Sequence, residues 1–452
     1  MFCGSCMHDN ALSRALSAEG WNIQLVPTYT PIRTDESDFS VDKVLFGGIN
    51  VYLQQKIPFL RYLPSVFDRF LDSPWLIRKV TSRARETDGA MLGSLAYSML
   101  LGSRGNQRKE VRKICRWMSL ARPDVLIFSN ILIGGCIEDI KQVVDCPVLV
   151  TLQGDDVFLD SLKPPYRSQC INRVKEIANK VDGFIVQSHF FKKYMCDYFS
   201  LDPLKVHVTP LGLEVADYNS FLSRVEDEPV RHTQTVGYLA RIAPEKGLHH
   251  LVEAFIKLKS MPGTENARLH VAGWLSPENQ AYADEQWGRL TRCGLQDSYR
   301  YEGAVDREAK LEFLRNIDLL SVPTAFQEPK GLYALEAMAA GVPVVLPSHG
   351  AFPELLEASG GGLLFEPENK TELAKTLSEL LLDGKRRLKL GGLGQRFVHQ
   401  HRNASVMAES TSKIIKKFVV CWFRQGSRER VTAGVWRTTE TVVISRRHAA
   451  GV

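Results

Sequence analysis

A switch from loop to helix separates two glutamates, Glu328 and Glu336, in the segment QEPKGLYALEAMAAG at residues 327–341. Pro329 disfavours a helix through Glu328, whereas residues 332–340 are strong helix formers that end before a glycine. We therefore predict Glu328 on a loop and Glu336 about one turn inside a helix, whose free N–H groups would face an anion. Because carboxylates accept hydrogen bonds from sugar hydroxyls, the pair suits a polyhydroxylated, phosphorylated ligand, and a nucleotide sugar is such a ligand.

Two cations stand upstream in the segment GYLARIAPEKGL at residues 237–248. Arg241 lies at the carboxyl end of a predicted strand, and Lys246 lies at the start of the helix that follows. Open α/β sheets bind phosphates in that crevice, and no Gly-x-Gly-x-x-Gly sequence is present here to bind them through the backbone alone. In isolation the two cations would be solvated charges on a turn, but with Glu328 and Glu336 downstream they favour a phosphate site. We expect Lys246 and Glu328 to be exposed in a cleft.

Short apolar runs alternate with helical patterns along the chain, which is typical of parallel α/β architecture. The predicted strands of the first half are 22–28, 124–129, 147–153, 182–188 and 205–209. Those of the second half are 235–240, 268–273, 298–302, 317–322, 343–347 and 361–365. The predicted fold class is therefore α/β with two Rossmann-like doubly wound domains, at residues 1–221 and 235–402, joined by a polar linker at 222–234. A last helix at 403–420 is expected to cross back to the first domain.

Two features of the first half depart from this alternation. Residues 45–119 are mostly helical, with aromatic and basic residues mixed, and indicate an insertion that packs over the sheet or lies on a membrane surface. No strand precedes the loop at Gly4 and the predicted helix 9–19, although a doubly wound domain has a central strand at this place. We expect either that translation begins upstream or that the domain lacks its first strand.

Composition indicates an ordinary globular protein, with 44% hydrophobic and 24% charged residues and no apolar run long enough to span a membrane. The first residues do not form a signal peptide, and nine scattered cysteines fit a reducing compartment, so we expect a cytoplasmic protein. Nine Lys and Arg against two acidic residues make residues 412–452 basic. We expect residues 421–452 to be a disordered tail, with contact to an anionic membrane or to nucleic acid as the alternatives. Of these two, a nucleic-acid partner is not expected.

Several segments together resemble glycosyltransferase family 4, also called group 1, whose members are retaining enzymes with the GT-B fold. GYLARIAPEKGL, VPTAFQEPKGLYALEAMAAGVPVV and GAFPELLEASGGGLLFEPEN resemble the donor domain of that family. PLGLEVADY resembles the segment that closes its first domain, and the first half is similar more loosely, through MFCGSCMHDNALSRAL, LQGDD and VQSHFFKKYM. The resemblance implies two Rossmann-like domains that face a cleft, with the acceptor on the first domain and the donor on the second.

The resemblance implies a role for each charged residue of the second half. Arg241 and Lys246 match the pair that neutralises the donor diphosphate and stabilises the leaving nucleotide. Glu336 matches the carboxylate that holds the ribose hydroxyls, and Glu328 matches the carboxylate near the donor sugar ring. Catalysis would then come from charge stabilisation by Arg241 and Lys246, with Glu328 at the reacting sugar.

The resemblance also implies donor contacts made by loops. The backbone amides of Gly331 and Leu332 match groups that contact the sugar or phosphate. Gly4 and Ser5 match the glycine-rich loop that faces the donor phosphates and the acceptor. Gln153 stands where many relatives carry a histidine that contacts the donor sugar, and its amide can still donate and accept hydrogen bonds.

No bound metal is expected. Asp155 and Asp156 could form an acidic metal site, but we favour an exposed turn, and GT-B enzymes usually need no metal. Cys3 and Cys6 form a Cys-x-x-Cys pair without a second pair to complete a metal site.

The resemblance implies a retaining glycosyltransferase that moves a sugar from a UDP-, GDP- or ADP-sugar to an acceptor hydroxyl, in glycan, glycolipid or exopolysaccharide biosynthesis. The acceptor would be a saccharide or a lipid-linked molecule, no cofactor would be tightly bound, and peripheral contact with the inner membrane face is an alternative to a purely cytoplasmic location. The anomeric bond would break through an oxocarbenium-like state. A nucleotide-sugar epimerase, a phosphorylase and a non-catalytic binding paralogue are the alternatives, and the absent first strand favours the last.

Overall fold

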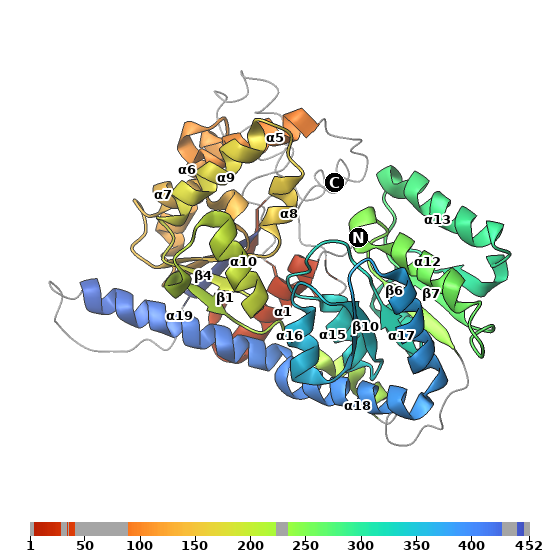
Figure 1. The fold of residues 1–452 in the computed structure, drawn as a ribbon. Coiled ribbons are helices and arrows are strands. Elements are labelled where there is room, and N and C mark those ends of the chain that lie inside the picture. Colours follow the sequence, from red (N-terminus) through yellow and green to blue (C-terminus); the bar gives the residue numbers. More distant parts are fainter. Residues whose placement is uncertain are drawn as a thin grey trace. The chain divides into compact units, whose positions relative to one another are not determined.

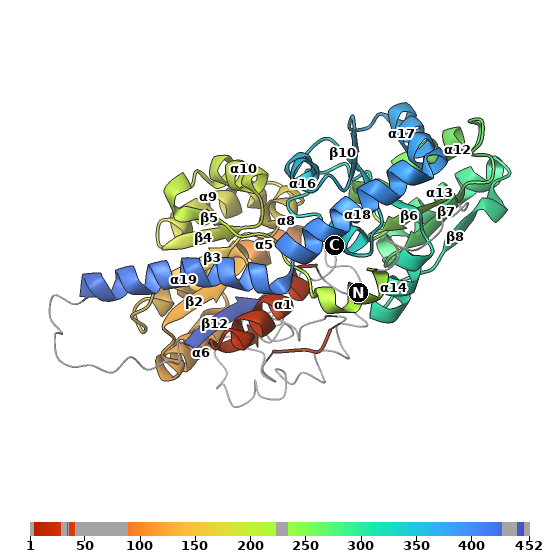
Figure 2. The same cartoon turned by 90° about the horizontal axis from the view of Figure 1, so that it is seen from below.

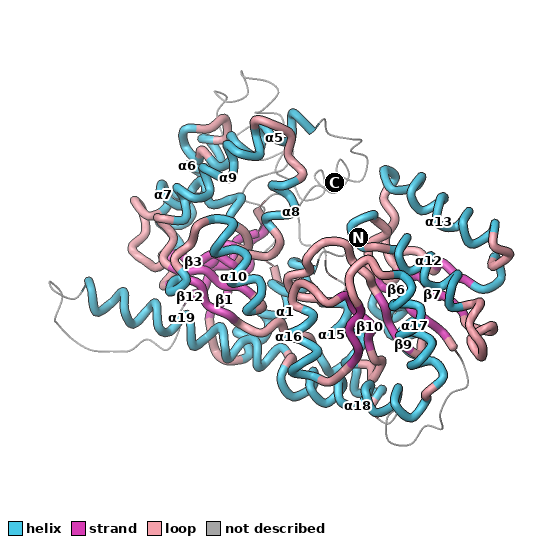
Figure 3. The backbone as a smooth tube through the Cα atoms, in the orientation of Figure 1, coloured by secondary structure: helices cyan, strands magenta, loops and turns pink. Residues whose placement is uncertain are grey.

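The structure is a computed structural model that describes residues 4–28, 34, 36–40, 89–222, 234–426 and 441–446. Contacts divide the chain into two compact units. The N-terminal unit comprises Phe2–Gln187, Lys192–Thr209 and Met407–Val452, and the C-terminal unit comprises Ser188–Phe191 and Pro210–Val406. Figure 3 shows that the strands of each unit gather in one sheet with helices around it. Most of the predicted linker 222–234 and residues 45–88 of the predicted insertion lie outside the described residues.

The C-terminal unit contains six parallel strands in the order β11-β10-β9-β6-β7-β8. These strands are β6 (Thr235–Leu239), β7 (Arg268–Ala272), β8 (Tyr299–Tyr301), β9 (Leu319–Ser321), β10 (Val344–Pro347) and β11 (Gly362–Phe365). Each lies where the sequence predicts a strand. The central strands β6, β9 and β10 are buried throughout, because short apolar runs suit strands that are covered on both faces. The chain runs outward from β6 through β7 to β8 and then returns to β9 on the other side. The topological switch point therefore lies between β6 and β9, where doubly wound sheets bind ligands.

In the described part of this unit, seven α-helices connect and flank these strands (Figure 1). They are α12 (Leu248–Leu258), α13 (Gln280–Arg292), α14 (Arg307–Arg315), α15 (Leu332–Ala339), α16 (Phe352–Ser359), α17 (Lys370–Leu382) and α18 (Gly384–His401). The helix α15 is apolar nearly all round, and seven of its eight residues are buried. Such a helix has no solvent face, so it forms part of the hydrophobic core of the unit.

The N-terminal unit contains six parallel strands in the order β1-β12-β2-β3-β4-β5. Five of them confirm predicted strands: β1 (Asn22–Pro27), β2 (Val125–Phe128), β3 (Val148–Thr151), β4 (Gly183–Val186) and β5 (Val206–Val208). The prediction of two Rossmann-like, doubly wound sheets is thus confirmed.

The sixth strand comes from the other end of the chain. β12 (Thr441–Arg446) lies parallel between β1 and β2, and its residue Ile444 stands opposite Leu25 on one side and Ile127 on the other. Residues 441–446 therefore differ from the prediction of a disordered tail, and they occupy the place of the central strand that the N-terminal domain was predicted to lack. The other residues of the predicted tail beyond Gly426 lie outside the described residues. The sequence TVVISR is rich in β-branched residues, which suits a central strand. Nothing local in the sequence connects this segment to a sheet that begins more than four hundred residues earlier.

Among the described residues of the N-terminal part, the α-helices are α1 (Gly4–Ala18), α5 (Gly89–Leu100), α6 (Arg108–Ala121), α7 (Ile137–Ile140), α8 (Asp155–Asp160), α9 (Tyr166–Ala178) and α10 (His189–Phe199). The long helix α19 (Ala404–Gly426) returns to this unit, and from Met407 onward it packs with α1 against one face of the sheet (Figure 2). Leu12 and Leu16 of α1 and Ile415 of α19 are fully or almost fully buried there. None of the described helices combines the length and the apolar character that crossing a membrane requires.

Candidate functional site

Two loops meet at the switch point of the C-terminal sheet, one after β6 and one after β9. The first loop contains a 3₁₀ turn, η7 (Pro244–Lys246), and then Gly247, whose φ of 72° lies in the left-handed region. A Cβ atom at Gly247 would collide with the carbonyl oxygen of Pro323 in the second loop, so glycine permits this close approach. The carbonyl oxygen of Glu245 accepts hydrogen bonds from the N–H of Ala325 at 2.9 Å and from the hydroxyl of Thr324 at 2.8 Å. The two loops are therefore fastened to one another by their backbones.

This junction brings together two of the predicted catalytic residues. The ammonium nitrogen Nζ of Lys246 lies 2.8 Å from Oε2 of Glu328, and the Lys246 ammonium also lies 4.4 Å from the ring centroid of Phe326. The prediction that both side chains are exposed is wrong, because the side chain of Lys246 is 14% exposed and that of Glu328 is 8% exposed. The two groups lie beneath aromatic and loop atoms and form a largely buried ion pair.

Glu328 also contacts the start of α15, as the loop-to-helix switch in the sequence predicts. Gly331 is the N-cap residue of α15, with φ 62° and ψ 48°, and its N–H donates a long hydrogen bond of 3.4 Å to Oε1 of Glu328. Burial raises the pKa of the Glu328 carboxyl, but the charge and hydrogen bond of Lys246 and the Gly331 N–H outweigh burial, and the pKa lies below its ordinary 4.5. Glu328 is therefore a carboxylate at neutral pH. Leu332 is the first residue of α15, so its N–H points out of the helix end.

Arg241 lies two residues beyond β6 and forms a second ion pair. Its Nη2 donates to Oε1 of Glu245 at 2.8 Å, and both side chains are about one-third exposed, at 30% and 35%. This pair is open to water, unlike the pair of Lys246 with Glu328, so a ligand anion could replace the Glu245 carboxylate at low cost.

Glu336 lies in the second turn of α15, as predicted, and pairs with Lys310, which is not among the predicted site residues. Oε1 of Glu336 accepts a hydrogen bond of 2.7 Å from Nζ of Lys310 on α14, and the side chains are 7% and 9% exposed. A lysine on the apolar face of a predicted amphipathic helix could have been noticed, since Lys310 stands three and four residues before the buried Phe313 and Leu314. Its partner could not have been deduced from spacing.

The structure places the predicted N-terminal site residues differently from the expectation. Gly4 and Ser5 lie in the first turn of α1 and not in a loop. Nε2 of Gln153 donates to Oδ1 of Asp9 at 2.9 Å and to the carbonyl oxygen of Ser129 at 3.2 Å. Both amide hydrogens of Gln153 are thus used within the N-terminal unit, so the expected donation to a sugar would require breaking one of these bonds.

The acidic pair Asp155 and Asp156 is buried at the start of α8, so the expectation of an exposed turn is wrong. Burial raises the pKa of Asp155 to about 7, against the opposing effect of backbone N–H groups of Gln153 and Ile131. Burial likewise raises the pKa of Asp156 to about 6. Within the described part of the chain, no group of three or more His, Cys, Asp and Glu side chains is arranged to hold a metal ion.

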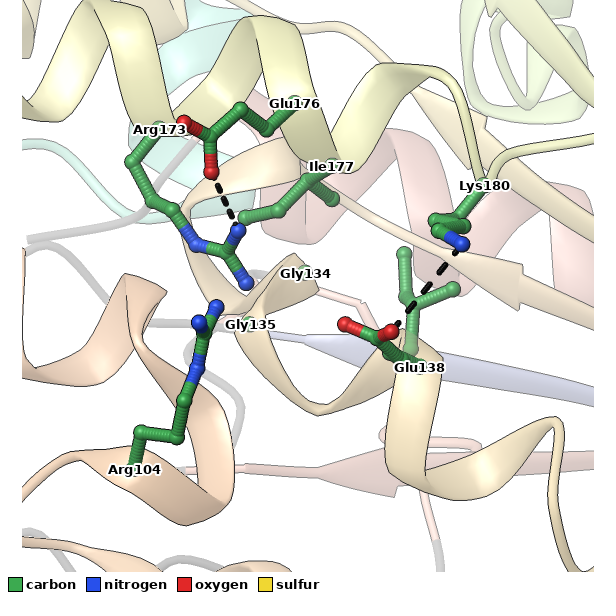
Figure 4. Close-up of a pocket in the computed structure, with 9 residues that line it drawn as sticks. Arg104, Gly134, Gly135, Glu138, Arg173, Glu176, Ile177 and Lys180 are labelled. Carbon is green, nitrogen blue, oxygen red and sulfur yellow. Dashed lines mark hydrogen bonds and ion pairs between the residues drawn. The ribbon is translucent and has the colours of Figure 1, made fainter.

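A cavity of about 270 Å³ lies among the helices of the N-terminal unit (Figure 4). The guanidinium groups of Arg104 and Arg173 point toward one another across it, and Arg173 also pairs with Glu176 at 2.6 Å. It is lined by Arg104, Gly134, Gly135, Ile137, Glu138, Arg173, Glu176, Ile177 and Lys180. None of the residues that the sequence singled out lines this cavity.

The C-terminal unit is similar in sequence to known proteins. Residues 224–396 match the family model of glycosyl transferases group 1. A D-inositol 3-phosphate glycosyltransferase of Corynebacterium efficiens is 26% identical over 244 residues, which cover 52% of this chain and 56% of that protein. The chain spans about half the length of this and similar curated relatives.

Solved structures share the fold over most of the chain. Sucrose-phosphate synthase from Thermosynechococcus elongatus superposes with a TM-score of 0.63 at 19% identity, over 91% of this chain and 92% of that one. Anabaena HepE, solved with UDP and glucose, superposes with a TM-score of 0.60 at 17% identity, over 88% of this chain and all of that one. The GT-B fold class implied by the resemblance is confirmed. Residues 224–396, in the C-terminal half of the chain, are therefore similar to glycosyl transferases group 1.

Proposed function

We propose that the protein is a glycosyltransferase that moves a sugar from a nucleoside-diphosphate sugar to an acceptor hydroxyl and retains the anomeric configuration. The observation that carries this proposal is the pairing of Lys246 with Glu328 at the switch point of the C-terminal sheet, beside the first turn of α15. A cation, a carboxylate and a helix N-terminus at one place suit the phosphates and hydroxyls of a single ligand. The match of residues 224–396 to group 1 supports the same class of reaction.

In this proposal the donor diphosphate competes with carboxylates for two cations. It displaces Glu245 from Arg241, and it shares Lys246 with Glu328. As the bond between the anomeric carbon and the diphosphate oxygen breaks, negative charge grows on the diphosphate, and the two cations stabilise it. The acceptor oxygen forms its bond on the same face, and its proton passes to the departing phosphate oxygen. The glutamates therefore need not act as a general acid and base.

The remaining predicted residues bind the donor in this proposal. Glu328 accepts hydrogen bonds from the transferred sugar, and Glu336 accepts them from the ribose. The N–H groups of Gly331 and Leu332, at the start of α15, contact the sugar or phosphate. The N-terminal unit binds the acceptor, which is a saccharide or a lipid-linked molecule in glycan or exopolysaccharide biosynthesis.

The proposed N-terminal donor contacts are Gly4, Ser5 and Gln153. The first two lie at the N-terminus of α1, a helix of fifteen residues, which suits an approach to phosphate. The hydrogen bond to Asp9 fixes the side chain of Gln153. In this proposal Gln153 therefore guides the donor by contact and not by donating a hydrogen bond. A cytoplasmic location and peripheral membrane contact stay predictions.

Donor binding tests the proposal most directly. HepE structures were solved with UDP or with UDP-glucose, so UDP is the first nucleotide to test, followed by GDP and ADP. We expect one of the three to bind the purified protein in calorimetry with a Kd in the micromolar to millimolar range, about 4–8 kcal/mol. A protein that binds none of them, and none of the corresponding sugar nucleotides, is not this enzyme.

Product analysis separates transfer from the alternatives. A labelled donor should yield free nucleoside diphosphate and a glycosylated acceptor, with the anomeric configuration of the donor in the first product seen by NMR. An epimerase would yield an isomeric sugar, and a phosphorylase would need inorganic phosphate. A non-catalytic paralogue would bind the nucleotide sugar and leave it intact.

A further inference from the structure

The proposed function assigns the ribose hydroxyls to Glu336, but it assigns no role to Lys310, the buried partner of that carboxylate. The two side chains come from different helices, α14 and α15, and Nζ lies 2.7 Å from Oε1. Lysine and glutamate are rarely this buried unless they are paired. We propose that Lys310 is a positioning residue, which holds the carboxylate of Glu336 in the orientation that recognises the ribose hydroxyls of the donor nucleotide. The inference rests on the proposed function.

The local structure sets the position of Lys310 independently of Glu336. Asp306 caps the N-terminus of α14, where its Oδ1 accepts a hydrogen bond of 2.9 Å from the N–H of Ala309. The N–H of Lys310 donates to the carbonyl oxygen of Asp306 at 2.9 Å, so Lys310 belongs to the first closed turn of the helix. Lys310, Phe313 and Leu314 are the buried residues of α14. The ammonium group therefore reaches Glu336 from a capped and packed helix, which restricts its movement.

The pair also determines how Glu336 can bind a ligand. An ionised carboxylate only accepts hydrogen bonds, and Lys310 occupies one side of Oε1. The other oxygen, Oε2, then remains for hydroxyl donors, and two hydroxyls on neighbouring ribose carbons can share one carboxylate. Without the ammonium group, Glu336 would be a buried charge with no counter-charge from Lys310, and its side chain would gain by turning toward water. Lys310 thus increases the preference of the site for a ribonucleotide over a deoxynucleotide. A change in the stability of the protein alone would not alter this preference.

Calorimetry with paired nucleotides tests this role. The probes are UDP, GDP and ADP, and then the 2′,3′-dideoxy form of the one that binds best. We expect the wild type to prefer the ribonucleotide by about tenfold or more, since hydrogen bonds to charged groups are strong. In Lys310→Met and in Glu336→Gln the preference should fall to within about threefold, and Lys310→Arg should restore part of it. The preference is the ratio of two dissociation constants measured on the same folded protein. A general loss of stability affects both constants alike and therefore cancels in the ratio.

A control variant separates positioning from the general loss of a paired lysine. Lys141→Met removes the lysine of a more exposed pair, which joins Asp182 at 2.7 Å in the N-terminal unit and whose side chains are each 23% exposed. It should keep the wild-type preference even where its melting temperature falls. If Lys310→Met does not fold, the double variant Lys310→Met/Glu336→Gln removes both charges and should fold with the same lost preference as Glu336→Gln.

Failure of the inference and failure of the proposed function give different results. A wild type that binds none of the three nucleotides, and none of the corresponding sugar nucleotides, contradicts the proposed function. A wild type that binds one of them but does not prefer the ribonucleotide, or a folded Lys310→Met that keeps the full preference, overturns the inference and leaves the proposed function standing. For the double variant, a preference equal to that of the wild type likewise overturns it.

Discussion

Nζ of Lys246 lies 2.8 Å from Oε2 of Glu328, across two loops that are about eighty residues apart in the sequence. The carboxylate that is proposed to bind the sugar is thus also the counter-ion of the cation that is proposed to bind the diphosphate. Because both side chains are largely buried, the site cannot lose one of them without leaving the other charge poorly compensated. Function and stability are therefore linked at this pair, in contrast to the expectation of two exposed side chains.

Replacing Lys246 with methionine should affect both properties. We expect kcat for sugar transfer to fall by about 100- to 1,000-fold, since one group that stabilises the leaving diphosphate is lost. The free energy of unfolding should also fall by about 3 kcal/mol, because Glu328 would remain as a buried charge without its cation. Steady-state kinetics and denaturant titration measure the two effects.

The double variant Lys246→Met/Glu328→Gln is the matched control for this prediction. It removes both charges, so its stability should lie closer to that of the wild type than the stability of Lys246→Met does. Its transfer rate should be no higher than that of the single variant. A double variant less stable than either single variant would show that the pair does not account for the stability change.

Replacing Arg241 with glutamine should affect binding with little effect on stability. Its ion pair with Glu245 is about one-third exposed, and such pairs contribute at most about 1 kcal/mol. We expect a loss of nucleoside-diphosphate affinity of about tenfold, seen by calorimetry, because hydrogen bonds to charged groups contribute about 1.5 kcal/mol or more.

The variant Glu245→Gln provides the opposite control for Arg241. It removes the competing carboxylate but keeps the backbone carbonyl that fastens the two loops. Nucleotide affinity should equal or exceed that of the wild type. A loss of affinity in Glu245→Gln as large as that in Arg241→Gln would contradict competition between Glu245 and the ligand.

Acid should destabilise the protein through Glu328. The folded-state pKa of Glu328 lies below its ordinary 4.5, so the native state binds fewer protons than the unfolded state in this range. The stabilisation is fully present above pH 4.5 and is lost as the pH falls through the folded pKa. The difference in unfolding free energy between the wild type and Glu328→Gln should therefore shrink from pH 6 to pH 3. A difference that stays constant over this range would assign the effect to packing and not to charge.

Removing the C-terminal strand should selectively destabilise the N-terminal unit. A chain that ends at Gly426 lacks β12, so β1 and β2 lose the strand that pairs with both of them. We expect the N-terminal unit to lose most of a typical domain stability of about 5–15 kcal/mol, which limited proteolysis and calorimetry would reveal. Nucleotide binding by the C-terminal unit should persist, since its sheet contains no part of β12.

A peptide can test whether the strand itself is responsible. A synthetic peptide of residues 436–450, added to the shortened chain, should restore protease resistance at high concentration, whereas a scrambled peptide should not. Within the full chain, Val443→Pro should reproduce the defect, because proline cannot donate to the ladder that Val443 shares with Gln24 and Leu126. A shortened chain as resistant as the wild type would show that β12 does not support the sheet.

The amino-acid sequence by itself determined the parallel strands of both sheets other than β12, and the loop and helix positions of Glu328 and Glu336. These features are local, because apolar runs, helix formers and proline or glycine breaks act within a few residues of one another. For the same reason, the positions of Arg241 and Lys246 beyond β6 could be predicted from the segment that contains them.

Only the tertiary structure decided which charges meet. The ion pair of Lys246 with Glu328 requires two loops to close on each other, and that of Lys310 with Glu336 requires two helices to pack. The burial of Asp155 depends likewise on its surroundings in the folded unit. The insertion of β12 between β1 and β2 joins residues from opposite ends of the chain. Such contacts depend on the free energy of long-range packing and loop closure, which no short stretch of sequence contains.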